Sequence, residues 1–123
     1  MNLVDSSGWL AFLADSANAE KFAEPIQDIG NLLVPSIVIY EVTEVLMREK
    51  GADSAIVAQA HLQQGSVVDL TASLACNAAL ISLQFSLPMA DSIILATARK
   101  YNAVVWTQDS DFEGREGVIF FPA

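Results

Sequence analysis

Cysteines, basic residues and long apolar runs are all scarce in this chain. Its 123 residues include a single cysteine, Cys76, so no internal disulfide can form. No apolar run approaches the ~18 residues that a membrane helix needs. The first residues, "MNLVDSSGW", carry neither a basic region nor a long apolar stretch. These absences predict a protein without a membrane span or a signal peptide, in keeping with a reducing cytoplasm.

Positive charge is scarce as well. Six Lys and Arg residues stand against fifteen Asp and Glu, which gives a formal net charge of −9. Nucleic-acid-binding domains are expected to be basic, because Lys and Arg neutralise phosphates. The charge therefore argues against such a domain, unless the acids are solvated at the surface or concentrated in a site that recruits a metal ion.

Apolar residues are abundant, at 53% of the chain. A chain of this length buries roughly two-thirds of its unfolded surface, which is enough for a core. The length predicts one domain over residues 1–123. We expect Cys76, in "SLACNAALI", to pack in that core as a small hydrophobe, and His61 to be an ordinary helix residue.

Short apolar segments alternate with helical patterns along the chain. The expected strands are residues 2–5, 31–35, 66–70, 103–107 and 117–121, and the expected helices are residues 7–15, 18–29, 36–51, 52–65, 71–85 and 89–101. Ser6 or Ser7 is the expected cap of the first helix and Ser36 that of the third, and Pro25 is able to break the second. The alternation predicts the α/β class, with a central parallel sheet covered by helices on both faces.

Acidic residues fall where such a fold places its sites. Sites in parallel sheets form beyond the C-terminal ends of the strands, where Asp5 follows the first strand and Asp109 and Asp111 follow the fourth. Asp91 falls in the first turn of a helix, and both Asp91 and Glu41 have mainly apolar neighbours at helical spacing. An ionised carboxylate in apolar surroundings costs several kcal/mol unless another group compensates it.

Two interpretations of these acids remain open. Each carboxylate can find its own backbone or Arg partner, although basic residues are few. Alternatively, Asp5, Glu41, Asp91 and Asp109 converge, and their charges repel one another unless a divalent cation lies between them. Oxygen ligands favour Mg²⁺ or Mn²⁺, whereas zinc prefers His and Cys.

Four motifs, "LVDSS", "YEVTEVL", "MADSIILATA" and "TQDSDF", occur in this order along the chain. Together they resemble the four acidic motifs of the PIN domain, and their spacing resembles that of the VapC-type toxins of bacterial and archaeal toxin–antitoxin pairs. The resemblance extends from residue 3 to residue 121. It implies a three-layer α/β/α sandwich with about five parallel strands, and a metal-dependent ribonuclease. It also implies a homodimer and a cognate antitoxin that blocks the site.

The resemblance also implies roles for the acids. Asp5, Glu41, Asp91 and Asp109 match the family's four catalytic acids. Asp5, Asp91 and Asp109 would hold Mg²⁺ or Mn²⁺, directly or through water, and Asp111 would help to hold a second ion. Glu41 would be a ligand or would orient the attacking water. Such an ion lowers the pKa of a bound water and neutralises charge on the phosphate in the transition state.

Two hydroxyl positions support these acids. Ser7 matches the family's hydroxyl two residues after the first acid, which would hydrogen-bond a ligand carboxylate or the scissile phosphate, and Thr107 matches the T of the last motif. Phe112 is expected in the core. The chain departs from the family in its charge: five of its acids belong to the proposed site, and the other ten exceed the six basic residues available to hold RNA.

Other functions fit parts of the same pattern. A PIN-like module that has lost its nuclease activity and only binds partners would keep the same fold. A receiver-type phosphoacceptor domain has a similar size and layout, but it needs paired acids after the first strand, where this chain has "VDSSG". Helical segments 36–47 and 73–85 are apolar on more than one stripe, which indicates either a dimer or antitoxin surface or burial against a covered sheet.

Overall fold

The structure, a computed structural model, describes all 123 residues. Its five strands form one parallel sheet in the order β3-β2-β1-β4-β5. The strands are β1 (Asn2–Val4), β2 (Leu32–Pro35), β3 (Ser66–Val68), β4 (Val104–Thr107) and β5 (Val118–Phe120). Each lies within a segment that the sequence predicts as a strand.

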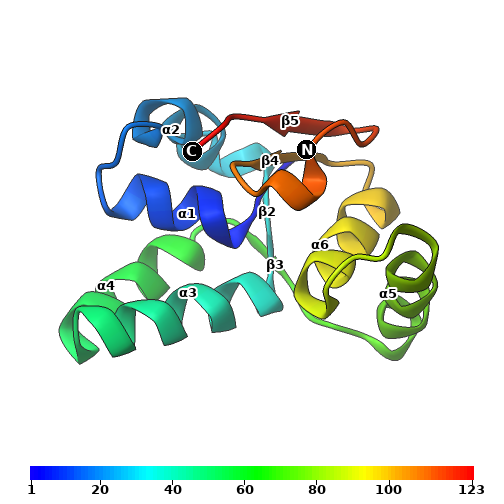
Figure 1. Ribbon diagram of the computed structural model, residues 1–123. Helices are drawn as coiled ribbons and strands as arrows, with labels where there is room; N and C mark the ends of the chain where they lie inside the picture. The colour runs from blue at the N-terminus through cyan, green and yellow to red at the C-terminus, as the bar shows by residue number, and fades with distance from the viewer.

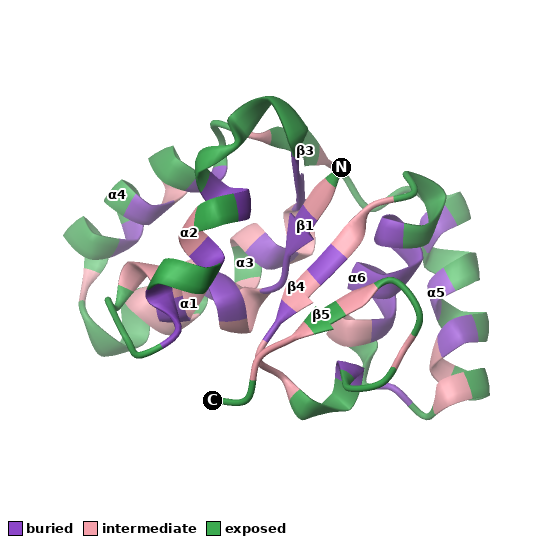
Figure 2. Cartoon of the chain, turned by 90° about the horizontal axis from the view of Figure 1, so that it is seen from above, coloured by how far each residue is buried: buried purple, intermediate pink, exposed green.

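Six helices cover the two faces of this sheet. They are α1 (Ser6–Leu13), α2 (Ala19–Gln27), α3 (Ser36–Glu49), α4 (Ala52–Leu62), α5 (Ala72–Phe85) and α6 (Met89–Lys100). Helices α1 to α4 lie on one side of the sheet and α5 and α6 on the other (Figure 1, Figure 2). The predicted α/β/α sandwich with a parallel sheet of five strands is therefore confirmed.

Burial explains why the apolar segments take these forms. All four residues of β2 are buried, as expected for a strand that is covered on both faces. In α6 every residue from Ser92 to Ala98 is buried, because the helix lies between the sheet and α5 (Figure 2). Phe112 is fully buried, which confirms its predicted place in the core.

The first helix lies unusually close to the first strand. A Cβ atom on Gly8 would come within 2.6 Å of Val4 Cγ1 and 2.8 Å of the Phe22 ring. Real Cβ contacts are not this short, so only glycine lets α1 approach β1 and α2 this closely. This approach sets the position of the residue between β1 and α1, which is Asp5.

The predicted helix caps are wrong at two places. The cap of α1 is Asp5, whose side chain accepts from the N–H of Gly8, and not Ser6 or Ser7. The chain turns into α1 one residue earlier than expected, so both serines are already helical. Ser36 likewise lies inside α3, because β2 runs directly into that helix and leaves Pro35 at the cap position without a side-chain cap bond.

The structure also differs from the expectations for Pro25 and Cys76. Helix α2 continues through Pro25 to Gln27, so the proline does not break it, although its ring removes the N–H that would bond the Lys21 carbonyl. Cys76 is exposed and not in the core, because α5 buries the stripe of Leu74, Ala78 and Ile81. His61 is an exposed residue in the last turn of α4, as predicted. No single helix is both long enough and apolar enough to cross a membrane.

Candidate functional site

Strands β1 and β4 bring two distant chain segments together at the C-terminal edge of the sheet. The two strands are parallel neighbours with Val4 beside Trp106, and the Asp5 N–H donates to the Trp106 carbonyl at 3.1 Å. The strand order reverses between β1 and β4, because β1 leads toward β2 on one side and β5 lies on the other. Crevices in open α/β sheets form at such a switch point.

Asp5 directly follows β1 at this switch point, held by three hydrogen bonds. Its Oδ1 accepts from the Ser7 hydroxyl at 2.7 Å and from the Gly8 N–H at 2.9 Å, and its Oδ2 accepts from the Thr107 hydroxyl at 2.6 Å. Ser7 was predicted to hydrogen-bond either a ligand carboxylate or the scissile phosphate, and in the structure it bonds the Asp5 carboxylate. Thr107 in turn accepts from the Asp109 N–H at 2.9 Å, so one hydroxyl joins the ends of β1 and β4.

Burial makes the charge on Asp5 costly. Only 2% of the residue is exposed. Burial and, to a smaller extent, the negative charge of Asp109 raise the pKa of Asp5 from 3.8 to about 6, against the hydrogen bonds from Thr107, Gly8 and Ser7, which lower it. Asp5 is therefore ionised at neutral pH only at a cost to the folded state.

Three more aspartates converge above Asp5. One carboxylate oxygen each from Asp91, Asp109 and Asp111 lies within 4.8 Å of the others, and we call these residues the three-aspartate cluster. Asp91 comes from the first turn of α6, and the other two follow β4, where Asp109 accepts from the Asp111 N–H at 2.9 Å. Burial, followed by the charges of Asp109, Asp5 and Asp111, raises the pKa of Asp91 to about 7.

No cationic side chain neutralises these carboxylates. The structure contains one ion pair, between Arg48 and Glu44 on the surface of α3. Arg115 lies near the cluster, but its Nε donates to the backbone carbonyl of Asp111 and not to the carboxylate. Of the two interpretations left open by the sequence, the first holds only in part: Asp5 and Asp109 each accept from a backbone N–H, but no arginine pairs with any of these acids.

The donor set fits a hard divalent cation. Convergent aspartate oxygens without a positive partner are the ligands that Mg²⁺ and Mn²⁺ prefer. The raised pKa values of Asp5 and Asp91 show the unrelieved repulsion and burial that an ion would relieve. The residues present therefore fit such a metal.

Glu41 is not part of the three-aspartate cluster. Its Oε1 accepts from the Ser6 hydroxyl at 2.6 Å, a bond that joins the start of α1 to α3. The structure thus brings together Asp5, Asp91, Asp109 and Asp111, and it links Glu41 to Ser6, the residue that follows Asp5. The sequence singled out Ser6 only as a helix cap, although the paired serines of "DSS" were the available signal for a second hydroxyl.

Comparisons with known proteins agree with this geometry. The PIN domain family profile matches residues 3–117. Among solved structures, a toxin–antitoxin complex from Klebsiella pneumoniae aligns at a TM-score of 0.82 with 19% sequence identity, covering 100% of both chains. VapC20 of Mycobacterium tuberculosis, described as a sarcin–ricin-loop-cleaving toxin, aligns at 0.78 with 22% identity, covering 91% of this chain and 92% of that one.

A third similar structure is VapBC2 from Rickettsia felis bound to a fragment of its promoter DNA. It aligns at a TM-score of 0.74 with 14% identity, covering 98% of this chain and 97% of the other. The comparison with curated proteins gave no match. The structural similarities support the fold, and the profile covers nearly the whole chain, so the chain belongs to the PIN domain family.

Proposed function

We propose that this protein is a Mg²⁺- or Mn²⁺-dependent endoribonuclease that hydrolyses RNA phosphodiester bonds, and that it is the toxin of a toxin–antitoxin pair. One observation carries the proposal: four aspartates from three parts of the chain meet at the switch point of a PIN-domain sheet without a basic partner. The similar structures described as toxins and toxin–antitoxin complexes support it.

The three-aspartate cluster is the proposed metal site. Asp91 and Asp109 hold the ion, and Asp111, which is more exposed, helps to hold a second one. When bound, Mg²⁺ or Mn²⁺ would lower the pKa of a water and offset the charge that builds on the phosphate during cleavage.

The remaining residues position this site. Asp5 acts on the ion directly or through water, since three hydrogen bonds leave part of its four lone-pair sites free. Ser7 and Thr107 hold the Asp5 carboxylate in one orientation. Because Glu41 lies outside the cluster and one of its oxygens is held by Ser6, we assign it to orienting the attacking water and not to binding the ion.

Exposed apolar side chains support the proposed partners. Tyr40 and Met47 on α3 are 58% and 51% exposed, and Leu80 and Leu83 on α5 are 66% and 84% exposed. Burial against the sheet therefore does not account for the extra apolar stripes on these helices. We attribute them to a homodimer contact and an antitoxin contact, within a single PIN-like domain over residues 1–123.

The strand order contradicts one of the two alternative functions and does not test the other. A receiver-type domain has the strand order 2-1-3-4-5, whereas this sheet has the order 3-2-1-4-5, so that alternative is wrong. A PIN module without nuclease activity would share every feature of the fold, and only an activity measurement separates it from the enzyme.

The test is cleavage of structured RNA by the purified protein with Mg²⁺ or Mn²⁺, and again with EDTA. We expect cleavage that EDTA abolishes, and no cleavage by Asp5→Asn or Asp91→Asn proteins that remain folded. Asp53→Asn removes one exposed carboxylate on α4, a helix that contributes no residue to the site, and should cleave as the wild type does. Equal cleavage by Asp91→Asn and wild type, or none by the wild type under any metal condition, would reject the proposal.

A further inference from the structure

The basic residues of this acidic protein mostly lack carboxylate partners. Only Arg48 forms an ion pair, although the chain carries fifteen acids. Four of the other five cations lie over aromatic rings: Lys21 over Phe121, Arg99 over Phe85, Lys100 over Tyr101 and Arg115 over Phe85. Their charges are thus held in place without being neutralised, and they remain available to an anion from outside.

Arg99 and Arg115 share a single ring. Their guanidinium carbons lie 5.2 Å and 5.0 Å from the centre of the Phe85 ring, so the two charges are within roughly 10 Å of each other. Two like charges held this close repel, and the ring offsets only part of that repulsion. A phosphate near both would stabilise both, because guanidinium groups donate paired hydrogen bonds to phosphate oxygens.

Arg115 connects this pair to the three-aspartate cluster. Its Nε donates to the Asp111 carbonyl at 2.9 Å, and its Nη2 donates to the Phe85 carbonyl at the end of α5 at 3.4 Å. These bonds give Arg115 a structural role at a helix end. Arg99 makes no hydrogen bond within the protein. Its charge lies over the Phe85 ring and in the last turn of α6, where it complements the helix dipole, and its donors stay free for an outside anion.

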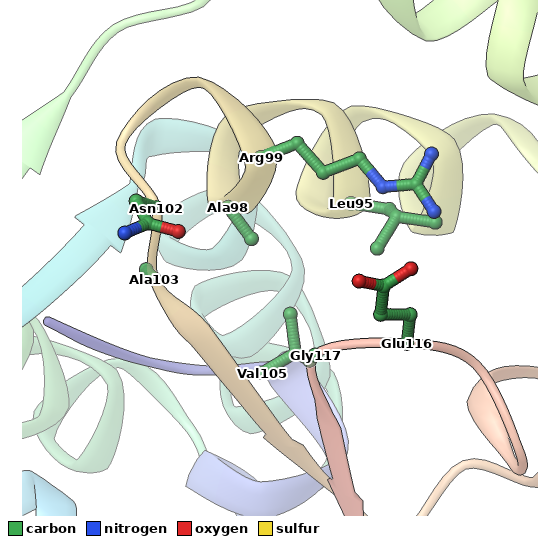
Figure 3. A pocket seen from close by; sticks show the side chains of 8 residues that line it. All are labelled: Leu95, Ala98, Arg99, Asn102, Ala103, Val105, Glu116 and Gly117. Atoms are coloured by element: carbon green, nitrogen blue, oxygen red, sulfur yellow. The ribbon is translucent and has the colours of Figure 1, made fainter.

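Polar hollows continue on both sides of Arg99. One, of about 500 Å³, lies between α5 and α6 and is lined by Asn77, Gln84 and Lys100 among others. The other, of about 330 Å³, contains Glu116, whose carboxylate faces Arg99 without forming an ion pair (Figure 3). The first hollow offers hydrogen-bond donors beyond Arg99, and the second holds the acid that most directly opposes an anion there.

We propose that Arg99 and Arg115, placed on the Phe85 ring, bind a backbone phosphate of the RNA strand next to the scissile bond. The hollow between α5 and α6 receives the following nucleotide. This inference rests on the proposed function, and it explains how a chain with a net charge of −9 holds RNA. Three of its six cations, Arg99, Lys100 and Arg115, lie along one path that begins at the three-aspartate cluster.

Binding of a labelled single-stranded oligoribonucleotide, followed by fluorescence anisotropy in EDTA over a range of salt concentrations, tests the inference. Each lost phosphate contact lowers the salt slope by about 0.7 and the affinity near 0.1 M salt by about 5-fold. We expect this change for Arg99→Gln, a smaller loss for Arg99→Lys, which keeps the charge, and tighter binding for Glu116→Gln.

Arg48→Gln is the matched control, because it removes the same charge from α3, across the molecule from α5 (Figure 1). It should bind RNA as the wild type does. Equal affinity and salt slope for Arg99→Gln and Arg48→Gln would overturn the inference, as would a Glu116→Gln protein that binds no more tightly than wild type.

Cleavage and binding measurements distinguish a failure of this inference from a failure of the proposed function. A protein that cleaves RNA in a metal-dependent way, but in which Arg99→Gln changes neither the KM nor the salt slope, refutes only the phosphate contact. A protein that binds RNA through Arg99 but cleaves none refutes only the nuclease. Because Arg115 also contacts Asp111, Arg99 is the cleaner position for these measurements.

Discussion

At the scale of single residues, Asp5 shows how the site and the stability of the fold oppose each other. The residue caps α1, accepts three hydrogen bonds and is almost fully buried. Each bond favours the ionised carboxylate, yet burial and the Asp109 charge outweigh them and raise its pKa to about 6. A side chain kept only for stability would not be an acid here, because a neutral one avoids this cost.

This conflict predicts how stability changes with pH in the absence of metal. A carboxyl whose pKa rises from 3.8 to about 6 on folding stabilises the protein fully below pH 3.8, and this contribution is lost as pH rises through 6. Relative to Asp5→Asn, which cannot ionise there, the wild type should lose about 2.5 kcal/mol between pH 4 and pH 8. Urea unfolding of both proteins in EDTA measures the difference, and a constant difference across this range would contradict the prediction.

The sequence located the aspartates of the site, and the family resemblance pointed to the hydroxyls of Ser7 and Thr107 that bond Asp5, but neither indicated the bond from Ser6 to Glu41. The rule that sites follow strand ends selected Asp5 and Asp109, and apolar helical neighbours selected Asp91. The bond from Ser6 to Glu41 joins residues 35 positions apart, and it depends on how α1 packs against α3. No local pattern contains that information, so it became visible only in three dimensions.

At the scale of elements, the closeness of α1 to β1 determines where Asp5 lies. The Gly8→Ala substitution places a methyl group against Val4 and Phe22, which are fully buried and have no room to move. We expect a loss of about 1–3 kcal/mol in the free energy of unfolding, with reduced RNA cleavage as Asp5 shifts from Thr107.

The matched control for this change is Gly30→Ala. Gly30 has open space around its missing Cβ and no positive φ, so the substitution should leave stability nearly unchanged. Thermal and urea unfolding of the two variants give the comparison. Equal stabilities for Gly8→Ala and wild type would show that α1 can move away from β1 without cost.

Element positions were predictable, and the caps of two helices were not. Short apolar segments bounded by polar residues identified all five strands. The buried strand β2 must be apolar because it is covered on both faces, and the partly exposed edge strands β3 and β5 are mostly apolar as well. Helix starts depend on how the chain leaves the preceding strand, as at Asp5 and Pro35, and this is set by the sheet and not by the local sequence. Pro25 lies inside α2 without ending it, although its ring removes the N–H that would bond the Lys21 carbonyl.

At the scale of the whole molecule, the negative charge is divided unevenly. The aspartates of the site repel one another and have no basic partner, while half of the cations lie along α6 and the loop after β4. Net charge alone argued against a nucleic-acid-binding protein. The arrangement of the charges supports one, because the negative region fits a metal ion and the neighbouring positive path fits phosphates.

This arrangement predicts that divalent ions stabilise the folded protein. An ion that binds only the folded state at about 100 times its Kd adds about 2.7 kcal/mol, which raises the melting temperature by roughly 10 °C for a domain of this size. We expect this rise with Mn²⁺ or Mg²⁺ at pH 8, measured against EDTA by calorimetry.

The Asp91→Asn variant should lose most of this rise in melting temperature. It should also be more stable than wild type in EDTA, because it removes repulsion from Asp109, Asp5 and Asp111. Asp53→Asn, which removes an exposed acid on α4, should keep the full rise. If Asp91→Asn and Asp53→Asn respond equally to the ion, the metal binds outside the three-aspartate cluster, and the convergence of these carboxylates has another cause.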